Sequence, residues 1–105
     1  MCVDHFVPNA SQYEVVKNGG EPMSCYLMWS DVKNNHNKYY IMQVLAKGNS
    51  HFLWIRYGRV GYDGNPSLGA SSSKESAERD YFKKYREKTG KGYTLVKMAI
   101  GKTEN

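Results

Sequence analysis

The sequence predicts an α+β domain in which a small antiparallel sheet carries one main helix on one face. Three observations indicate this fold: an almost continuous apolar run, a hairpin signal directly after it, and a capped amphipathic segment, at residues 39–46, 47–50 and 72–90. At 105 residues the chain is long enough for one modest core but short for most enzymes. We therefore expect a single domain over residues 1–105, with irregular tails at 1–12 and 101–105.

Two short strands are predicted in the N-terminal third, over residues 13–16 and 25–29. The segment Asn18-Gly-Gly-Glu-Pro22 separates them and carries a strong turn signal. A polar, asparagine-rich stretch over residues 30–38 follows the second strand and is interpreted as a loop.

The best strand covers residues 39–46, whose apolar character predicts a central position covered on both faces. Residues 47–50 form a hairpin connection, and residues 51–57 are the returning strand. Residues 59–62 either continue this strand or begin a short neighbour. The glycine- and serine-rich stretch 61–73 is expected to be a long loop.

The main helix is expected to begin at Ser72, because Ser72 and Glu75 have capping-box spacing, in which each side chain satisfies the other's free backbone donor. One apolar face then follows, made of Ala77, Tyr81, Phe82 and Tyr85. Gly90 ends the helix after a run of cations, and residues 93–100 are the closing strand.

The formal charge of +5 is unevenly distributed along the chain. Residues 1–32 hold four acidic side chains and one basic one, a net charge of −3, whereas residues 33–105 hold fourteen basic and six acidic ones, a net charge of +8. Tyrosines are interleaved with these cations. This is the usual electrostatic footprint of a nucleic-acid binder, and a basic domain without a polyanion partner is the alternative.

The sequence indicates neither a metal site nor a cofactor. Cys2 and Cys25 are the only cysteines and form no Cys-x-x-Cys pair, and the three histidines are scattered. Both thiols are interpreted as reduced. There is no P-loop and no recognisable nucleophile motif, so we expect a binding module and not an enzyme. No secretion signal and no membrane-length apolar run is present, so no membrane partner is expected.

The most informative segment is Trp54-Ile-Arg-Tyr-Gly-Arg-Val-Gly-Tyr-Asp-Gly64. Alternation along a strand places Tyr57 and Arg59 on one face and Arg56 on the other. Gly58 lies between them without a side chain, so the backbone of a partner can approach closely. A planar ring beside a guanidinium suits a sugar-phosphate terminus, because the ring packs on sugar or base and the fork bonds phosphate oxygens. The alternative is a strand that ends in a glycine turn with solvated arginines.

Several segments, taken in order, resemble the WGR domain of the DNA-dependent poly(ADP-ribose) polymerases. They are Val3-Asp4, Asn34-Asn-His-Asn-Lys-Tyr-Tyr-Ile-Met-Gln43, Arg56-Tyr-Gly-Arg-Val-Gly61, Tyr81-Phe-Lys-Lys-Tyr-Arg-Glu-Lys-Thr-Gly90 and Gly92-Tyr-Thr-Leu-Val96. Each motif is weak alone, but together and in order they indicate the family over nearly the whole chain.

The resemblance implies a nuclear module that binds DNA at ends or nicks and contacts a 5′-terminal phosphate. It also implies a partner, a separate ADP-ribosyltransferase catalytic domain in cis or in trans, to which DNA binding is relayed. The implied DNA contacts are the signature pair, the polar loop, the closing-strand tyrosine and the first arginine of the motif: Arg59 and Tyr57, then Asn35, Asn37 and Lys38, then Tyr93, and Arg56.

Two departures from the family pattern affect this site. Tyr57 stands where the family has its signature tryptophan, which implies stacking over a smaller area and weaker DNA binding. Trp54 cannot replace it, because three residues earlier on a strand it faces the other way. The loop that usually precedes the last strand is missing or very short before Tyr93.

A second hypothesis is a protein-interaction module that docks onto a catalytic domain and has little DNA affinity of its own. In that case Arg59 would bridge to the neighbouring protein domain. Tyr39 and Tyr40 are interpreted as core and sheet residues under either hypothesis. The helix cations are interpreted as a solvated face, and among them only Lys83 and Lys84 together are candidates for binding, on a weak signal.

Overall fold

The computed structural model describes residues 2–97, which form one main antiparallel sheet, a small two-stranded sheet and a single long helix. The strands are β1 (Glu14–Val15), β2 (Lys17–Asn18), β3 (Glu21–Pro22), β4 (Ser24–Asp31), β5 (His36–Lys47), β6 (Ser50–Arg59), β7 (Asn65–Ser71) and β8 (Thr94–Lys97). The helices are the 3-10 turn η1 (Ala10–Gln12) and α1 (Lys74–Gly90). The predicted α+β fold class is confirmed.

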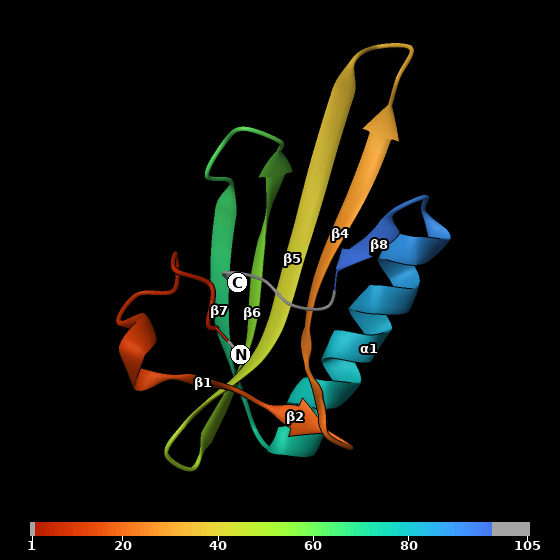
Figure 1. The fold of residues 1–105 in the computed structure, drawn as a ribbon. Helices are drawn as coiled ribbons and strands as arrows, with labels where there is room; N and C mark the ends of the chain where they lie inside the picture. Colours follow the sequence, from red (N-terminus) through yellow and green to blue (C-terminus); the bar gives the residue numbers. More distant parts are fainter. Residues whose placement is uncertain (1, 98–105) are drawn as a thin grey trace.

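The main sheet has the strand order β7–β6–β5–β4–β8, and every pairing in it is antiparallel (Figure 1). The short strand β1 pairs with the end of β5, beyond the point where β4 begins. β2 and β3 form a small separate hairpin, whose turn residues Gly19 and Gly20 both have positive φ. This turn lies where the sequence predicts one.

The central strand β5 organises the core. All residues from 39 to 45 are buried, as its apolar run predicts for a strand covered on both faces. On one face Tyr40, Met42 and Val44 pack with Ala77 and Tyr81 of α1. The helix therefore covers one face of the sheet along its length.

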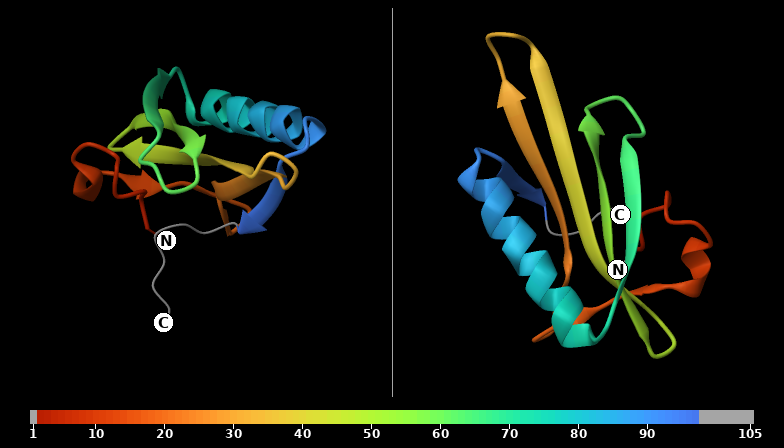
Figure 2. Two further views of the ribbon diagram at one scale, coloured as in Figure 1. Left: turned by 90° about the horizontal axis from the view of Figure 1, so that it is seen from above. Right: turned by 180° about the vertical axis from the view of Figure 1, so that it is seen from behind.

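The N-terminal segment covers part of the opposite face, as the view from above shows (Figure 2). Residues 2–9 are irregular, but they do not form a loose tail, since Asp4 and Val7 are only 2% and 3% exposed. Val7 packs against Leu45 and Trp54 of the sheet. α1 and this segment therefore enclose the sheet from two sides, and residues 98–105 lie outside the described part of the chain.

Two details of the predicted helix are wrong. Its N-cap is Ser73, whose side chain accepts a hydrogen bond of 3.0 Å from the Ser76 amide, so the helix begins one residue later than the Ser72 capping box predicts. Phe82 is 41% exposed. Successive helical residues are rotated by about 100°, so Phe82 points away from the sheet while its neighbour Tyr81 points into it. The predicted end at Gly90 is confirmed.

Two predicted loops are largely strand. In the stretch 30–38, β4 runs on to Asp31 and β5 begins at His36, which leaves only residues 32–35 as the turn of a long projecting hairpin (Figure 1). In the stretch 61–73, β7 pairs with β6 along seven residue positions. Backbone pairing outweighs local composition in both places, because a strand edge needs hydrogen-bonding partners whatever its side chains are.

The remaining predicted strands lie close to their expected places. β1, β4 and β6 overlap the predictions at 13–16, 25–29 and 51–57, and β6 ends at Arg59. The closing strand β8 covers the described part of the predicted stretch 93–100.

Candidate nucleic-acid interface

A hollow of about 280 Å³ opens on the helix side of the sheet, where β5 and β6 approach the end of α1. We call it the basic hollow. Its lining residues come from β5, β6, α1 and the residue before β8, and they are Lys38, Tyr40, Tyr57, Gly58, Arg59, Lys88 and Tyr93.

Strand register brings together the four side chains of the hollow that come from β5 and β6. In the β5–β6 ladder Lys38 is paired with Arg59, and Tyr40 is paired with Tyr57. Directly paired residues point to the same face of a sheet. The rings of Tyr40 and Tyr57 are stacked, with centroids 5.7 Å apart and planes 30° from parallel. Tyr40 is 5% exposed and Tyr57 is 46% exposed, so a buried ring supports an accessible one.

The C-terminal end of α1 completes the hollow. The Tyr93 amide donates a hydrogen bond of 3.1 Å to the Lys88 carbonyl, which fixes Tyr93 beside the last helical turn. The Tyr93 ring meets Tyr40 edge-on, with centroids 6.1 Å apart. The Lys88 Nζ lies 4.7 Å from the Tyr40 ring centroid and 5.8 Å from that of Tyr93. The short connection before β8 therefore places Tyr93 in the hollow.

The electrostatics of the basic hollow favour an anion. Among the described residues that line it, three are cationic and none is acidic. Burial, and then the nearby charges of Lys91 and Lys84, lower the pKa of Lys88. Burial raises the pKa of Tyr40 to about 12 and also raises that of Tyr93, so both hydroxyls stay protonated at neutral pH. An anion bound here would offset the mutual repulsion of the cations.

The two arginines of the motif have opposite surroundings. Arg59 is exposed, and within residues 2–97 no hydrogen bond or ion pair engages its guanidinium. Arg56 is 8% exposed and lies on the other face of the sheet. It donates from Nε to the Asp4 carboxylate over 2.8 Å. The structure therefore presents one free guanidinium fork and one that is already occupied.

Residues 23–99 match the family model of the WGR domain. The chain belongs to the WGR domain family. It is 41% identical over 69 residues to protein mono-ADP-ribosyltransferase PARP3 of Mus musculus, an alignment that covers 66% of this chain and 13% of that protein. It is 30% identical over 121 residues to poly [ADP-ribose] polymerase 2 of Arabidopsis thaliana, covering 98% of this chain and 19% of that protein. The WGR domain thus spans less than a fifth of the length of these relatives.

The basic hollow of this WGR domain unites four of the seven predicted contact residues: Lys38, Tyr57, Arg59 and Tyr93. The other three lie elsewhere. Asn35 is exposed in the turn of the β4–β5 hairpin with φ 54°, and strand alternation turns the exposed Asn37 away from its neighbour Lys38. Arg56 lies on the opposite face, in the pair with Asp4.

Gly58 has a different role from the one its sequence position suggests. A Cβ at Gly58 would lie 2.9 Å from the Cα of Gly64. The backbone that approaches Gly58 is therefore the chain's own, from the loop between β6 and β7, rather than that of a partner. The prediction of an open approach for a partner is therefore wrong on the Tyr39 side of the strand, whereas on the other side Gly58 lines the basic hollow.

Lys88 lines the basic hollow but is not among the seven predicted contacts, although its position in the sequence carries a signal. Lys88 follows the buried Tyr81 by seven residues, and this spacing places both on the same helix face. A lysine on the helix face that packs against the sheet is a better candidate for a binding contact than a lysine on the solvent-facing side. Lys83 and Lys84 lie apart from the basic hollow, in a depression that they share with Asp80 and Glu87.

Among residues 2–97, no group of three or more His, Cys, Asp and Glu side chains is arranged to hold a metal ion. Cys2 is exposed and Cys25 is buried, and both are free thiols. Neither helix in the described range is long and apolar enough to cross a membrane.

Proposed function

We propose that this WGR domain is a non-catalytic module that recognises DNA strand breaks through the sugar-phosphate backbone and a 5′-terminal phosphate. WGR domains are generally nucleic-acid-binding. The observation that carries the finer proposal is the free Arg59 guanidinium beside the half-exposed Tyr57 ring, in a hollow whose other cations are Lys38 and Lys88.

The chemistry of a terminal phosphate suits this arrangement. It carries more charge than an internal diester and has more free acceptor oxygens, which the planar guanidinium of Arg59 can bond as a fork. Tyr57 presents a ring face on which the terminal sugar or base can pack. Lys38 and Lys88 are point charges at the border of the same hollow and would neutralise neighbouring phosphates without distinguishing between them.

The proposed binding is independent of base sequence. The candidate contacts are arginine, lysine and tyrosine side chains around a hollow, and contacts of this kind fix position on the backbone without reading bases. Reading bases requires a helix or ribbon in the major groove. Two ion pairs lie on α1, Lys74–Glu78 and Lys84–Glu87, and their members are already engaged with each other.

The proposal also includes a partner and a location. The relatives are named as ADP-ribosyltransferases or polymerases, and this chain spans only 13% and 19% of two of them. We therefore propose that the domain relays DNA binding to an ADP-ribosyltransferase catalytic domain, in cis or in trans, and that it acts in the nucleus. The remaining candidate contacts of the sequence, Asn35 and Asn37, would meet DNA backbone beyond the hollow. For Arg56 we propose a structural role, because its guanidinium is buried against Asp4.

A titration of DNA hairpins with a single open end tests this proposal. The two hairpins differ only in the presence of a 5′-phosphate at that end, and binding is measured by fluorescence anisotropy over a series of salt concentrations. The wild-type domain is expected to prefer the phosphorylated end and to lose affinity steeply as salt is added. Equal affinity for the two ends, or a strong dependence on base sequence, would overturn the proposal.

Two variants sharpen the test. Arg59→Lys keeps the charge and removes the fork, so it should retain general DNA affinity and lose most of the preference for the phosphorylated end. Lys38→Gln is the matched control, because it should weaken binding to both ends alike and reduce the salt slope by about one. If Arg59→Lys binds both ends as the wild type does, and the domain instead binds the catalytic domain of a relative, the protein-interaction hypothesis takes the place of this one.

A further inference from the structure

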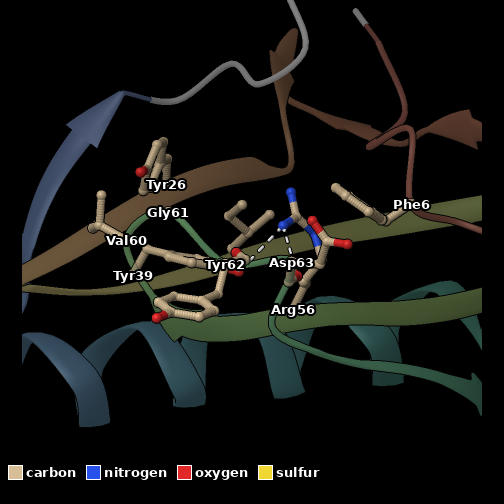
Figure 3. A pocket seen from close by; sticks show the side chains of 9 residues that line it. Phe6, Tyr26, Tyr39, Arg56, Val60, Gly61, Tyr62 and Asp63 are labelled. Atoms are coloured by element: carbon tan, nitrogen blue, oxygen red, sulfur yellow. Dashed lines mark hydrogen bonds between the residues drawn. The ribbon is translucent and has the colours of Figure 1, made fainter.

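A second hollow, of about 250 Å³, lies on the opposite face of the sheet (Figure 3). Its lining includes Phe6 from the N-terminal segment, Tyr39 from β5 and Arg56 from β6, together with residues 60–63 of the loop after Arg59. Figure 3 shows the Arg56 guanidinium directed toward this loop. The hollow is the place where the N-terminal segment, the sheet and the β6–β7 loop are joined by polar bonds.

The first link joins the N-terminal segment to Arg56. Both nitrogens of one edge of the guanidinium bond the Asp4 carboxylate, Nε to Oδ2 over 2.8 Å and Nη2 to Oδ1 over 3.2 Å. Trp54 Nε1 donates to the same Oδ2 over 2.9 Å. The Asp4 amide in turn donates to Gln43 Oε1 over 2.9 Å. Asp4 therefore holds Arg56 in one orientation, with Nη1 left to reach the loop.

The second link joins Arg56 to the β6–β7 loop. Its Nη1 donates to the Asp63 carbonyl over 3.0 Å and to the Tyr39 hydroxyl over 3.3 Å. The Tyr39 hydroxyl donates onward to the Tyr62 carbonyl over 2.6 Å. The backbone carbonyls of Tyr62 and Asp63, in an otherwise exposed loop, thus accept hydrogen bonds from side chains of the sheet.

The third link joins the loop to the basic hollow. The loop ends at Gly64, which has φ 81° and whose Cα would lie only 2.9 Å from a Cβ on Gly58. A Cβ on Gly64 would collide with the Tyr39 hydroxyl and the Tyr57 carbonyl. Gly58 stands between Tyr57 and Arg59, so the backbone that bears both side chains is in contact with the anchored loop.

We infer that Tyr39, held by the Asp4–Arg56 pair, is a positioning residue for the basic hollow: it anchors the β6–β7 loop and thereby sets the backbone from which Tyr57 and Arg59 project. The inference rests on the proposed function, because the positioned groups are the proposed contacts of the 5′ end. It assigns a part in recognition to the N-terminal segment, although that segment lies on the face of the sheet opposite the basic hollow.

Tyr39→Phe tests this role with little risk to folding, since it removes one hydroxyl and keeps the buried ring. The preference for the phosphorylated hairpin should fall about two- to tenfold, which corresponds to the lower part of the usual coupling energies between residues of one network. Amide hydrogen exchange at Tyr62, whose N–H donates to the Arg59 carbonyl over 3.1 Å, should become faster. The matched control is Tyr13→Phe, at a ring that packs on Phe52 away from the loop and should leave both readouts unchanged.

A double-mutant cycle with Arg59→Lys separates positioning from general destabilisation. If Tyr39 acts through Arg59, adding Tyr39→Phe to Arg59→Lys should cause no further loss of the phosphate preference. The positioning role alone would be overturned if Tyr39→Phe kept the wild-type preference for the phosphorylated hairpin. It would also be overturned if Tyr39→Phe and Tyr13→Phe reduced that preference equally. A wild-type domain without any preference for the 5′-phosphate would overturn the proposed function, and this inference with it.

Discussion

The Lys88 ammonium lies over the face of the Tyr40 ring, with its Nζ 4.7 Å from the ring centroid. This contact brings the end of α1 to the central strand and adds a third cation to the basic hollow. Burial is the main reason why the pKa of Lys88 is lowered, followed by repulsion from Lys91 and Lys84. The charge is therefore held at a place where a phosphate would relieve both the desolvation and the repulsion.

Lys88→Gln is expected to weaken DNA binding and to reduce the salt slope by about one, because one fewer phosphate is neutralised. Affinity should fall for phosphorylated and unphosphorylated ends alike. The measurement is a salt titration by fluorescence anisotropy. Lys83→Gln is the matched control, since Lys83 is an exposed cation of the same helix outside the hollow. Equal effects of the two substitutions would show that only net charge matters.

Tyr57→Ala is expected to weaken DNA binding by about 1–3 kcal/mol, the usual loss when a stacking ring is removed. Tyr57→Trp should tighten binding, because the larger ring offers more stacking area over the supporting Tyr40. Both are measured by hairpin titration together with thermal unfolding. Phe82→Ala removes another half-exposed ring, away from the hollow, and should leave binding unchanged. A Tyr57→Ala domain that loses stability but no affinity would identify this ring as a core residue only.

The sequence predicts the fold correctly where burial dictates side-chain chemistry, as in the apolar run at 39–46. It also does so where a local signal marks the end of an element, as at the exposed Gly90 after its run of cations. β7 was not predicted because it is an exposed edge strand whose small and polar side chains leave only Leu68 and Ser71 partly buried. The strand pairing within the asparagine-rich stretch 30–38 is not predicted for a related reason. Pairing between β4 and β5 continues there, although the local composition favours a turn.

The candidate site likewise contains residues that the sequence predicts and contacts that it does not. Lys38, Tyr57, Arg59 and Tyr93 could be named from the family resemblance, and strand alternation separates Arg56 from Arg59 without a structure. The Asp4–Arg56 pair could not be predicted, because its partners are 52 residues apart and neither spacing nor composition joins them. The approach of the loop to the glycine of the motif is equally a product of tertiary packing.

Gly64→Ala is expected to destabilise the domain strongly. A non-glycine residue in this left-handed conformation costs about 1–3 kcal/mol by itself, and the new methyl group would also collide with the Tyr39 hydroxyl. Gly61→Ala, in the same loop with φ 98° but with no atom within 4 Å of the added Cβ, carries the strain alone. Thermal unfolding should therefore show a clearly larger loss of stability for Gly64→Ala than for Gly61→Ala. Equal losses would mean that the loop shifts to accommodate the methyl group at position 64 without further destabilisation.

Asp4→Asn is expected to lower the free energy of unfolding by about 3–5 kcal/mol at neutral pH, because it leaves the buried Arg56 guanidinium without its counter-charge. The size of this loss should depend on pH. Burial alone would raise the pKa of Asp4, but hydrogen bonds from Arg56, Trp54 and the Phe6 amide together lower it below its ordinary value. The ionised carboxylate therefore stabilises the folded state.

The sign of the pH dependence of stability follows from the lowered pKa of Asp4. A carboxyl group whose pKa is lower in the folded state contributes its full stabilisation above its unfolded pKa of about 3.9 and loses it as the pH falls through the folded value. Denaturant unfolding at pH 7, 5 and 3 should thus show a constant gap between wild type and Asp4→Asn at the two higher pH values, and a narrower gap at the lowest. Glu14→Gln, at an exposed position on β1, is the control and should change stability by less than about 0.5 kcal/mol. A gap that does not narrow on acidification would mean that the amide loses packing and hydrogen-bond geometry, and that the charge of Asp4 contributes little.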